Sequence, residues 1–301
     1  MAALSSPVIE ARDLRKLYGE LEAVKGVNFT VQAGTCTGLL GPNGAGKTTM
    51  MRMIMGLTRP SGGDLSVFGE PARTLVRDSQ RRIGLVPQED NLDPDLSVAN
   101  NLWVYGRYFG LSAPALAERV PALLAFVALS EKADAPVMQL SGGMKRRLII
   151  ARALIGDPEL VILDEPTTGL DPQSRVLVWK KLLALREQGK TLLLTTHYMD
   201  EAQRLCDWII VVDGGQILDE GSPQQLIRSH VKRSTFELTK PVPEAVWING
   251  EDHEDVGDAI YVYTDDDGFA ERLPPETIVY HRPSNLEDVF LRLTGRTLRD
   301  G

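Results

Sequence analysis

Length, composition and charge already exclude several classes of protein. The chain has 301 residues, of which 43% are hydrophobic and 25% are charged, so it can bury the cores of one large and one small domain. Its formal net charge of −8 argues against broad attraction to nucleic acid, and we expect no nucleic-acid partner. Because no run of roughly 18 uncharged apolar residues occurs, we expect that it does not cross a membrane by itself.

The first part of the chain predicts an antiparallel sheet, then a buried strand and a helix. The pattern indicates strands at Val8–Leu14 and Val27–Val31, on either side of the turn Tyr18-Gly19-Glu20. Thr35–Leu40 is a short apolar strand that runs into a glycine-rich loop, and Thr48–Gly56 has helical character. Unbranched methionines on this helix are favoured as core fillers over a Met-lined ligand groove, namely Met50, Met51, Met53 and Met55.

The middle of the chain predicts a mostly parallel sheet with a helical insert. Arg82–Val86 is a short strand closed by Pro87. Helical periodicity then dominates from about residue 96 to residue 140, with helices expected at Ser97–Phe109 and Ala113–Leu129. Alternating strand and helix units of this kind indicate parallel strands covered by helices. The three later strands are expected at Leu160–Leu163, Thr191–Thr195 and Trp208–Val212.

After Gly221 the pattern changes to that of a small α+β domain. The residues Ser284–Glu287 fit the spacing of a capping box for a last helix, Leu286–Leu293. The acidic run Asp265-Asp266-Asp267-Gly268 favours a solvated turn with glycine at positive φ over a metal site. We expect a nucleotide-binding domain at 1–230, with its helical insert at about 96–145, and an accessory domain at 231–301. A short helix, Ser222–Ser229, is expected just before the accessory domain. Within the domain, strands are expected at Thr235–Leu238, Ala259–Tyr263 and Thr277–His281.

The strongest single motif is a phosphate-binding loop. The run Gly41-Pro42-Asn43-Gly44-Ala45-Gly46-Lys47-Thr48 matches the pattern G-x-x-x-x-G-K-[ST]. Glycines let the backbone N–H groups turn inward around phosphate oxygens, and the following helix presents its positive N-terminus to them. Lys47 is expected to reach the β- and γ-phosphates and Thr48 to coordinate Mg²⁺, with Thr49 also in the ATP site. A glycine-rich turn without a ligand is the alternative.

A second motif adds carboxylates to the end of an apolar strand. The strand Leu160–Leu163 is expected to deliver Asp164 beside the phosphate loop, where it can hold Mg²⁺ directly or through water. Glu165 follows and is placed to polarise the attacking water. Alone, this pattern fits a simple strand end equally well, but phosphoryl transfer needs the γ-phosphate, the metal and the water held in line. Together with the loop, it predicts a site for phosphoryl transfer.

A third motif, Leu140-Ser141-Gly142-Gly143-Met144, places a serine and two glycines at the start of a helix. Taken alone, it favours a plain N-cap turn over a second anion-binding device. We interpret the adjacent Lys145-Arg146-Arg147 as a solvated helix face. With all three motifs, residues 8–225 resemble the ABC ATPases. The resemblance implies a P-loop NTPase fold of ABC type: a mostly parallel core, an antiparallel β subdomain and a helical subdomain, here with a small C-terminal α+β domain.

The resemblance also implies roles for single residues. In this family the Leu-Ser-Gly-Gly segment of one subunit closes over ATP bound to another, so Ser141, Gly142 and Gly143 are expected to bind ATP in a homodimer or in a dimer with a related ATPase. Met144 stands where the family usually has Gln, which we interpret as a subgroup trait. The resemblance implies that Tyr18 stacks on adenine and that Gln88 approaches Mg²⁺ and the γ-phosphate. It also implies that Asp171 crosses the dimer interface and that His197 acts with Glu165 in catalysis.

Three strings narrow the resemblance to subunits that drive export of drugs or lipo-oligosaccharides. They are the runs 86–96, 140–147 and 283–295. This implies an integral membrane permease on a separate chain and a peripheral location at the cytoplasmic face of the membrane. An importer ATPase with a C-terminal regulatory domain is one alternative. A soluble ABC ATPase of translation or DNA maintenance is another, which the acidic charge and the lack of a second nucleotide domain disfavour.

Overall fold

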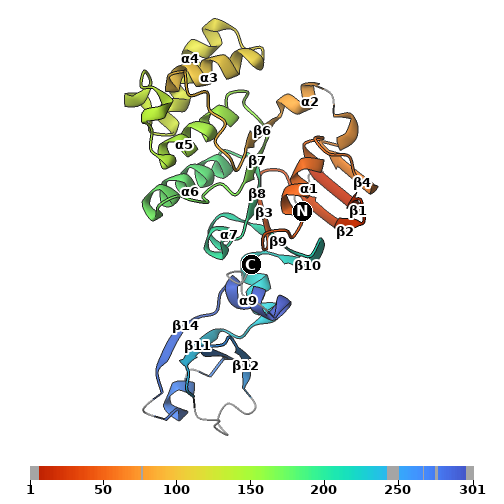
Figure 1. The fold of residues 1–301 in the computed structure, drawn as a ribbon, viewed down its shortest axis with the longest axis vertical. Coiled ribbons are helices and arrows are strands. Elements are labelled where there is room, and N and C mark those ends of the chain that lie inside the picture. The colour runs from red at the N-terminus through yellow and green to blue at the C-terminus, as the bar shows by residue number, and fades with distance from the viewer. Residues whose placement is uncertain (1–6, 76, 243–250, 267, 275–276, 296–301) are drawn as a thin grey trace, which may run out of the picture. The chain divides into compact units, whose positions relative to one another are not determined.

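The computed structural model describes residues 7–75, 77–242, 251–266, 268–274 and 277–295 (Figure 1). Its chain divides into two units, Met1–Ile217 and Leu218–Gly301. The domain boundary expected at residue 230 remains a prediction. Among the described residues, no helix is both long enough and apolar enough to span a membrane.

The first sheet is antiparallel and has the strand order β2-β1-β4-β5. Strand β1 (Ile9–Tyr18) pairs with β2 (Leu21–Val31) up to the pair Tyr18 and Leu21. Both strands run on to the turn, further than predicted, because Gly19 adopts φ 60° and so permits a tight two-residue connection. On the other side of β1 lie β4 (Gly62–Val67) and β5 (Glu70–Pro71), which were not predicted.

The second sheet holds six strands in the order β10-β9-β3-β8-β7-β6. The pairs β3 with β8, β3 with β9, β6 with β7, and β7 with β8 are parallel, which confirms the predicted sheet type. Strands β3 and β8 are buried throughout, as expected for parallel strands covered on both faces. The strands are β3 (Cys36–Leu40), β6 (Ile83–Val86), β7 (Leu160–Asp164), β8 (Thr191–Thr196), β9 (Trp208–Asp213) and β10 (Gln216–Gly221).

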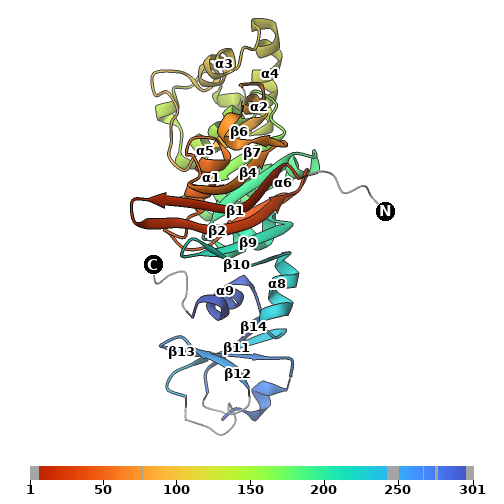
Figure 2. The same cartoon turned by 90° about the vertical axis from the view of Figure 1, so that its right-hand side faces the viewer.

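Helix α1 (Lys47–Ile54) joins the two sheets into one core. Its buried Met50, Met51 and Met53 belong to the same apolar cluster as Ile9 of β1 and Ile162 of β7. This burial confirms that the methionines are core fillers. Figures 1 and 2 both show α1 beside β1 and β4, so the loop before α1 is held between the two sheets.

The remaining helices of this unit include the predicted helical insert. Figure 1 shows α3, α4 and α5 on the side of the parallel strands away from β1 and β2. Helix α3 is shorter than predicted because Ser97 and Phe109 are its caps, and α4 ends at Phe126, before the predicted end at Leu129. The helices are α2 (Arg77–Arg81), α3 (Val98–Tyr108), α4 (Ala113–Phe126), α5 (Gly142–Ala153), α6 (Pro172–Glu187) and α7 (Met199–Leu205), with 3-10 turns at Ala72–Thr74, Ser130–Lys132 and Val137–Gln139.

The second unit has its own antiparallel sheet, of order β12-β13-β11-β14. Phe236, Leu238, Val262 and Phe269 form its apolar core. The predicted elements are present with shifted ends, and β12 was not predicted. The elements are α8 (Pro223–His230), β11 (Ser234–Thr239), β12 (Asp252–Asp255), β13 (Ala259–Thr264), a 3-10 turn at Phe269–Arg272, β14 (Val279–Pro283) and α9 (Leu286–Thr294).

Two local predictions in this unit are wrong. The capping box of α9 is formed by Asn285 and Asp288, one residue later than expected. Ser284 is not free to cap the helix, because its hydroxyl forms a buried hydrogen bond of 2.8 Å with Thr235. Gly268 has φ −85° and so does not supply a positive φ; it begins a 3-10 turn instead.

A buried ion pair ties α9 to the sheet of the second unit. The Asp288 carboxylate is fully buried and receives two hydrogen bonds from Arg282 of β14, at 2.7 and 2.8 Å. It also accepts hydrogen bonds from the Thr235 hydroxyl at 3.1 Å and from the backbone N–H of Asn285 at 2.8 Å. Removing the cation would leave a carboxylate buried without its charge partner.

We therefore expect Arg282→Met to destabilise the second unit by about 3 kcal/mol, since an uncompensated buried charge is costly. Arg272→Met is the matched control: Arg272 pairs with Glu251 at 2.7 Å but is 49% exposed, so its loss should cost less than about 1 kcal/mol. Hydrogen exchange at the amides of β11 and α9, together with urea unfolding, measures both variants. Equal effects for the two arginines would contradict the prediction.

Candidate nucleotide site

The loop at residues 41–46 connects the buried strand β3 to the start of α1. Two of its glycines are required by neighbouring backbone: a Cβ at Gly41 would lie 2.0 Å from the carbonyl oxygen of Val212, and one at Gly46 would lie 2.6 Å from that of Ala23. Gly44 and Gly46 have φ 81° and 101°, which few residues with a Cβ adopt. The loop can therefore keep this shape only with glycine at these positions.

Lys47 is the first residue of α1 and is only 4% exposed. Its ammonium donates to the carbonyl oxygens of Gly41 and Pro42, both at 2.8 Å, so it lies across its own loop. Burial lowers the pKa of Lys47, while the nearby Glu165 and Asp164 act in the opposite direction. A cation held in this way is well suited to an anion that enters the loop.

Glu165 is the centre of a polar cluster just after β7. Its Oε2 accepts hydrogen bonds from the Gln88 amide at 3.2 Å and the Thr168 hydroxyl at 3.0 Å. Its Oε1 lies 3.2 Å from Nδ1 of His197. The contact with His197 is the main cause that lowers the pKa of Glu165, against an opposing effect of burial. The side chain is 8% exposed, so the ionised carboxylate is held by neighbours rather than by bulk water.

Backbone strain and strand pairing fix the position of this carboxylate. Glu165 adopts φ 45°, which is uncommon for a residue with a Cβ and often marks functional sites. Asp164 is paired with Thr195 of the adjacent strand β8. The Thr195 hydroxyl donates to Asp164 Oδ1 at 2.6 Å and accepts from the Glu165 amide at 3.1 Å. Thr195 and Thr168 were missed by the sequence motifs, although strand register could have suggested Thr195.

The other predicted site residues lie apart from this cluster. Ser141 is the N-cap of α5 and accepts a hydrogen bond from the Met144 amide at 3.3 Å. Asp171 caps α6 through the Ser174 amide at 2.9 Å, and a Cβ at Gly143 would lie 2.2 Å from the Ser174 hydroxyl oxygen. Tyr18 is 48% exposed at the end of β1. Within the described part of the chain, no hydrogen bond or ion pair given by the structure joins these residues to the phosphate loop.

Arg146 corrects the prediction of a solvated helix face at Lys145-Arg146-Arg147. It is only 7% exposed, and burial lowers its pKa to about 10 despite the nearby carboxylates. Backbone carbonyl oxygens replace the lost water around its guanidinium group. Arg147 is half-buried and donates to the carbonyl oxygens of Val127 and Ala128 instead. The pattern of three adjacent cations gave no sign that one of them points inward.

The polar groups near Lys47 fit the requirements of Mg²⁺. The predicted ligands Thr48, Gln88 and Asp164 offer a hydroxyl, an amide carbonyl and a carboxylate, which are all oxygen ligands. Because the amide nitrogen of Gln88 is directed to Glu165, its carbonyl oxygen is left available for a cation. Among the described residues there is no cluster of three or more His, Cys, Asp or Glu side chains that could hold a metal alone. Mg²⁺ in proteins usually keeps several waters and is bound through one or two carboxylates together with phosphate oxygens.

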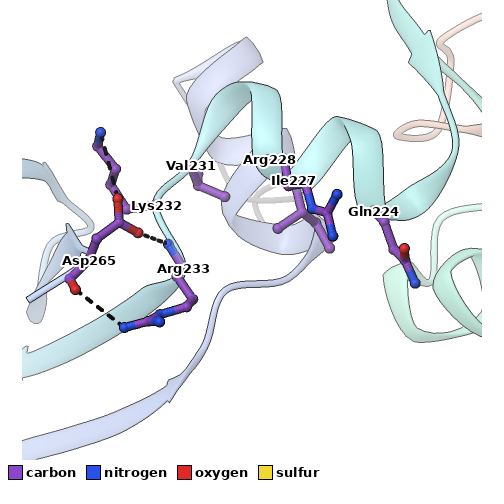
Figure 3. Close-up of a pocket in the computed structure, with 7 residues that line it drawn as sticks. All are labelled: Gln224, Ile227, Arg228, Val231, Lys232, Arg233 and Asp265. Atoms are coloured by element: carbon purple, nitrogen blue, oxygen red, sulfur yellow. Dashed lines mark hydrogen bonds and ion pairs between the residues drawn. The ribbon is translucent and has the colours of Figure 1, made fainter. Parts of the chain in front are cut away.

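A separate pocket of about 420 Å³ lies in the second unit along α8 (Figure 3). Asp265 accepts a hydrogen bond from the Arg233 amide at 2.8 Å and lies 3.9 Å from the ammonium group of Lys232. None of the predicted site residues lines this pocket, which also includes Gln224, Ile227, Arg228 and Val231.

Comparison with known proteins places this geometry in a family. The family model described as ABC transporter matches residues 24–168, and the model described as nodulation factor export protein NodI, C-terminal domain, matches residues 247–295. The Nod factor export ATP-binding protein I of Burkholderia lata is 50% identical over 299 residues, with 97% of this chain and 98% of the relative covered. Its counterpart from Cupriavidus metallidurans is 49% identical over 300 residues, with 97% and 99% covered.

Solved structures show the same fold. An ATP-binding subunit of an ABC transporter matches with a TM-score of 0.66 and 29% identity, over 74% of this chain and 92% of that chain. A dimeric ATP-binding cassette in a post-hydrolysis state, bound to ADP and Pi, matches with a TM-score of 0.64 and 29% identity, over 71% and 98%.

The chain therefore belongs to the ABC transporter family of ATP-binding proteins. Within that family it groups with the Nod factor export ATP-binding proteins, and it is an ATP-hydrolysing subunit of the exporter class. These comparisons confirm the predicted fold class, the ATPase activity and the exporter hypothesis, and they give no support to the importer and soluble alternatives. The roles of single residues remain predictions.

Proposed function

We propose that this chain powers export of a lipo-oligosaccharide through a separate integral membrane permease, by binding and hydrolysing ATP as a dimer at the cytoplasmic face of the membrane. The observation that carries the proposal is the arrangement of Gln88 and His197 around the Glu165 carboxylate, next to the phosphate loop and Lys47. The relatives named for Nod factor export support the substrate class.

The phosphate loop and Lys47 bind the ATP phosphates in this proposal. Backbone N–H groups of residues 41–46 and the N-terminus of α1 face the anion, and the Lys47 ammonium moves from its own carbonyls to the β- and γ-phosphates. Thr48, Gln88 and Asp164 hold Mg²⁺, which when bound neutralises the charge that develops on the phosphates. Tyr18, exposed at the end of β1, stacks on the adenine ring.

Glu165 and His197 then act on the attacking water. The ionised Glu165 orients the water and accepts its proton, as a general base placed by hydrogen bonds from Gln88 and Thr168. His197 contacts both Glu165 and the γ-phosphate, so it aligns the nucleophile with the group that is transferred. The strained backbone of Glu165 keeps the carboxylate aimed at this position.

A second ATPase subunit completes the site. Ser141 and Gly142 are exposed at the N-terminus of α5, where free N–H groups can bind the γ-phosphate on the partner subunit. Asp171 caps α6 nearby and lies at the same interface. The dimeric state of the matched cassette supports this arrangement. ATP shifts the population towards the closed dimer, and hydrolysis resets it.

The permease is proposed to contact a groove of about 350 Å³ beside α3. This groove leads to the loop after Gln88, because Arg152 lies over the ring of Tyr105 at 4.8 Å and donates to the carbonyl oxygen of Asn91 at 2.8 Å. Tyr108 at its rim is 82% exposed, so its ring is available for contact with a partner. The groove is lined by Gln80, Arg81, Tyr105, Tyr108 and Phe109.

The experiment is a pull-down of the tagged chain from detergent-solubilised native membranes, with mass spectrometry of every co-purifying chain. We expect a polytopic membrane protein at a ratio of roughly one to one, and Tyr108→Asp should reduce its recovery about tenfold or more. Tyr280→Asp, which changes a tyrosine that is 64% exposed in the second unit, should leave recovery unchanged. Recovery of only soluble proteins, ribosomes or DNA would overturn the export proposal.

A further inference from the structure

Arg146 uses its whole guanidinium group to bind backbone. Nε donates to the carbonyl oxygen of Pro166 at 2.6 Å, and Nη2 donates to those of Asp164 at 2.9 Å and Glu165 at 3.0 Å. Nη1 donates to the carbonyl oxygens of Pro87 and Gln88. Guanidinium has five N–H donors, so every donor is accounted for by a carbonyl group and none is left for solvent.

These carbonyls belong to the two segments that carry the proposed hydrolytic groups. One segment contains Gln88, and the other contains Asp164 and Glu165. The side chains of Gln88 and Glu165 are themselves in contact, at 3.2 Å, although the residues are 77 positions apart in the chain. Arg146 is therefore a clamp that sets the distance between two backbones, and this distance decides where the two side chains meet.

The clamp is attached to the helix that begins at the exposed Ser141 and Gly142. Other side chains of α5 hold the same loop after β6: Lys145 lies 3.5 Å from Asp90, and Arg152 donates to the Asn91 carbonyl. Helix α5 is thus in direct contact with the loop after β6 and, through Arg146, with the end of β7.

We propose that Arg146 is a positioning residue that couples the Ser141–Gly143 segment to the hydrolytic groups Gln88 and Glu165. The inference rests on the proposed function of that site. When the partner subunit's nucleotide draws in the start of α5, Arg146 carries the shift to Gln88 and Glu165 and brings the water-orienting carboxylate into place. Hydrolysis then depends on dimer closure, because the clamp and the closing segment lie on one helix.

The test variant is Arg146→Lys, which keeps the charge but has three donors for five carbonyls. We expect kcat for ATP to fall about 10- to 100-fold, since small displacements of positioned groups have effects of this size. The Kd for ATP should stay within about threefold and the melting temperature within about 5 °C. Arg147→Lys, on the same helix but bonded to Val127 and Ala128, should keep wild-type kcat.

A double variant separates positioning from a general structural role. Because Arg146 is proposed to act through Glu165, Arg146→Lys should not lower the residual kcat of Glu165→Gln any further. Additive losses would overturn the proposal, as would a kcat within threefold of wild type for Arg146→Lys alone. A fall in kcat matched by equal losses of ATP affinity and thermal stability would show an ordinary structural anchor and overturn it too.

If the Arg146 variants do not fold, hydrogen exchange tests the coupling in a chain that keeps Arg146. On adding ATP and Mg²⁺ to the Glu165→Gln chain, amide protection at residues 142–146 and at residues 88–91 should rise together. Protection at 142–146 alone would refute the coupling while leaving the proposed function intact. No protection in either segment and no ATP-dependent dimer would instead refute the proposed function.

Discussion

Glu165→Gln is expected to lower the ATP turnover rate by about 10²-fold or more while ATP binding is retained. Glutamine preserves the size of the side chain and can still contact Gln88, Thr168 and His197, but it cannot accept a proton from water. The ATP-bound dimer should therefore accumulate. Phosphate release measures the turnover rate, and size-exclusion chromatography with quantification of bound nucleotide measures the dimer.

Glu159→Gln is the matched control for this prediction. Glu159 immediately precedes the same strand, β7, at its opposite end and bonds Arg82 on the surface at 2.7 and 2.8 Å. Its loss should leave turnover within about twofold of wild type, as is usual for surface ion pairs. Full ATPase activity in Glu165→Gln would remove Glu165 from the catalytic assignment.

Lys47→Ala is expected to abolish measurable ATP binding, with the Kd raised about 10²-fold or more. The buried Lys47 ammonium lies across the phosphate loop and donates to its carbonyl oxygens. Charge-assisted hydrogen bonds to phosphate are among the strongest in proteins. Titration with a fluorescent ATP analogue measures the Kd. The melting curve should be recorded as well, because the carbonyls of Gly41 and Pro42 lose a donor.

The control for this variant is Lys25→Ala, on the exposed face of β2. It should bind ATP with wild-type affinity and melt at the wild-type temperature. If Lys47→Ala folded normally and also kept its affinity for ATP, the role assigned to the phosphate loop would be wrong.

The contiguous motifs were the most predictable part of the site. The run 41–48 specifies its own geometry, because a few residues encode everything that the loop needs. These are the glycines at positive φ, the strand that precedes the loop and the helix that follows it. The same holds for Asp164 and Glu165, because Asp164 ends a strand whose preceding residues are apolar and buried, and Glu165 follows it. Their place at the end of the strand could be predicted without knowledge of any distant partner.

Arg146 and the α9 cap show where such prediction failed. A run of three cations is ordinary on a solvated helix, and only the approach of residues 87–88 and 164–166 makes the middle one a buried clamp. The capping box of α9 starts one residue late because Ser284 is bonded to Thr235, which lies 49 positions earlier in the chain. In both cases, a contact distant in sequence outweighed a reasonable local pattern.

Local sequence thus determined the phosphate loop and the apolar strands, because each depends on interactions among neighbours in the chain. The alternation of these strands with helices indicated the type of fold. The tertiary structure alone decided that Gln88 and His197 both contact the Glu165 carboxylate, and that Thr195 bridges Asp164 to the Glu165 backbone. The physical reason is the order and register of the parallel strands: β6, β7 and β8 are adjacent, so their carboxyl ends bring together side chains that no spacing along the sequence relates.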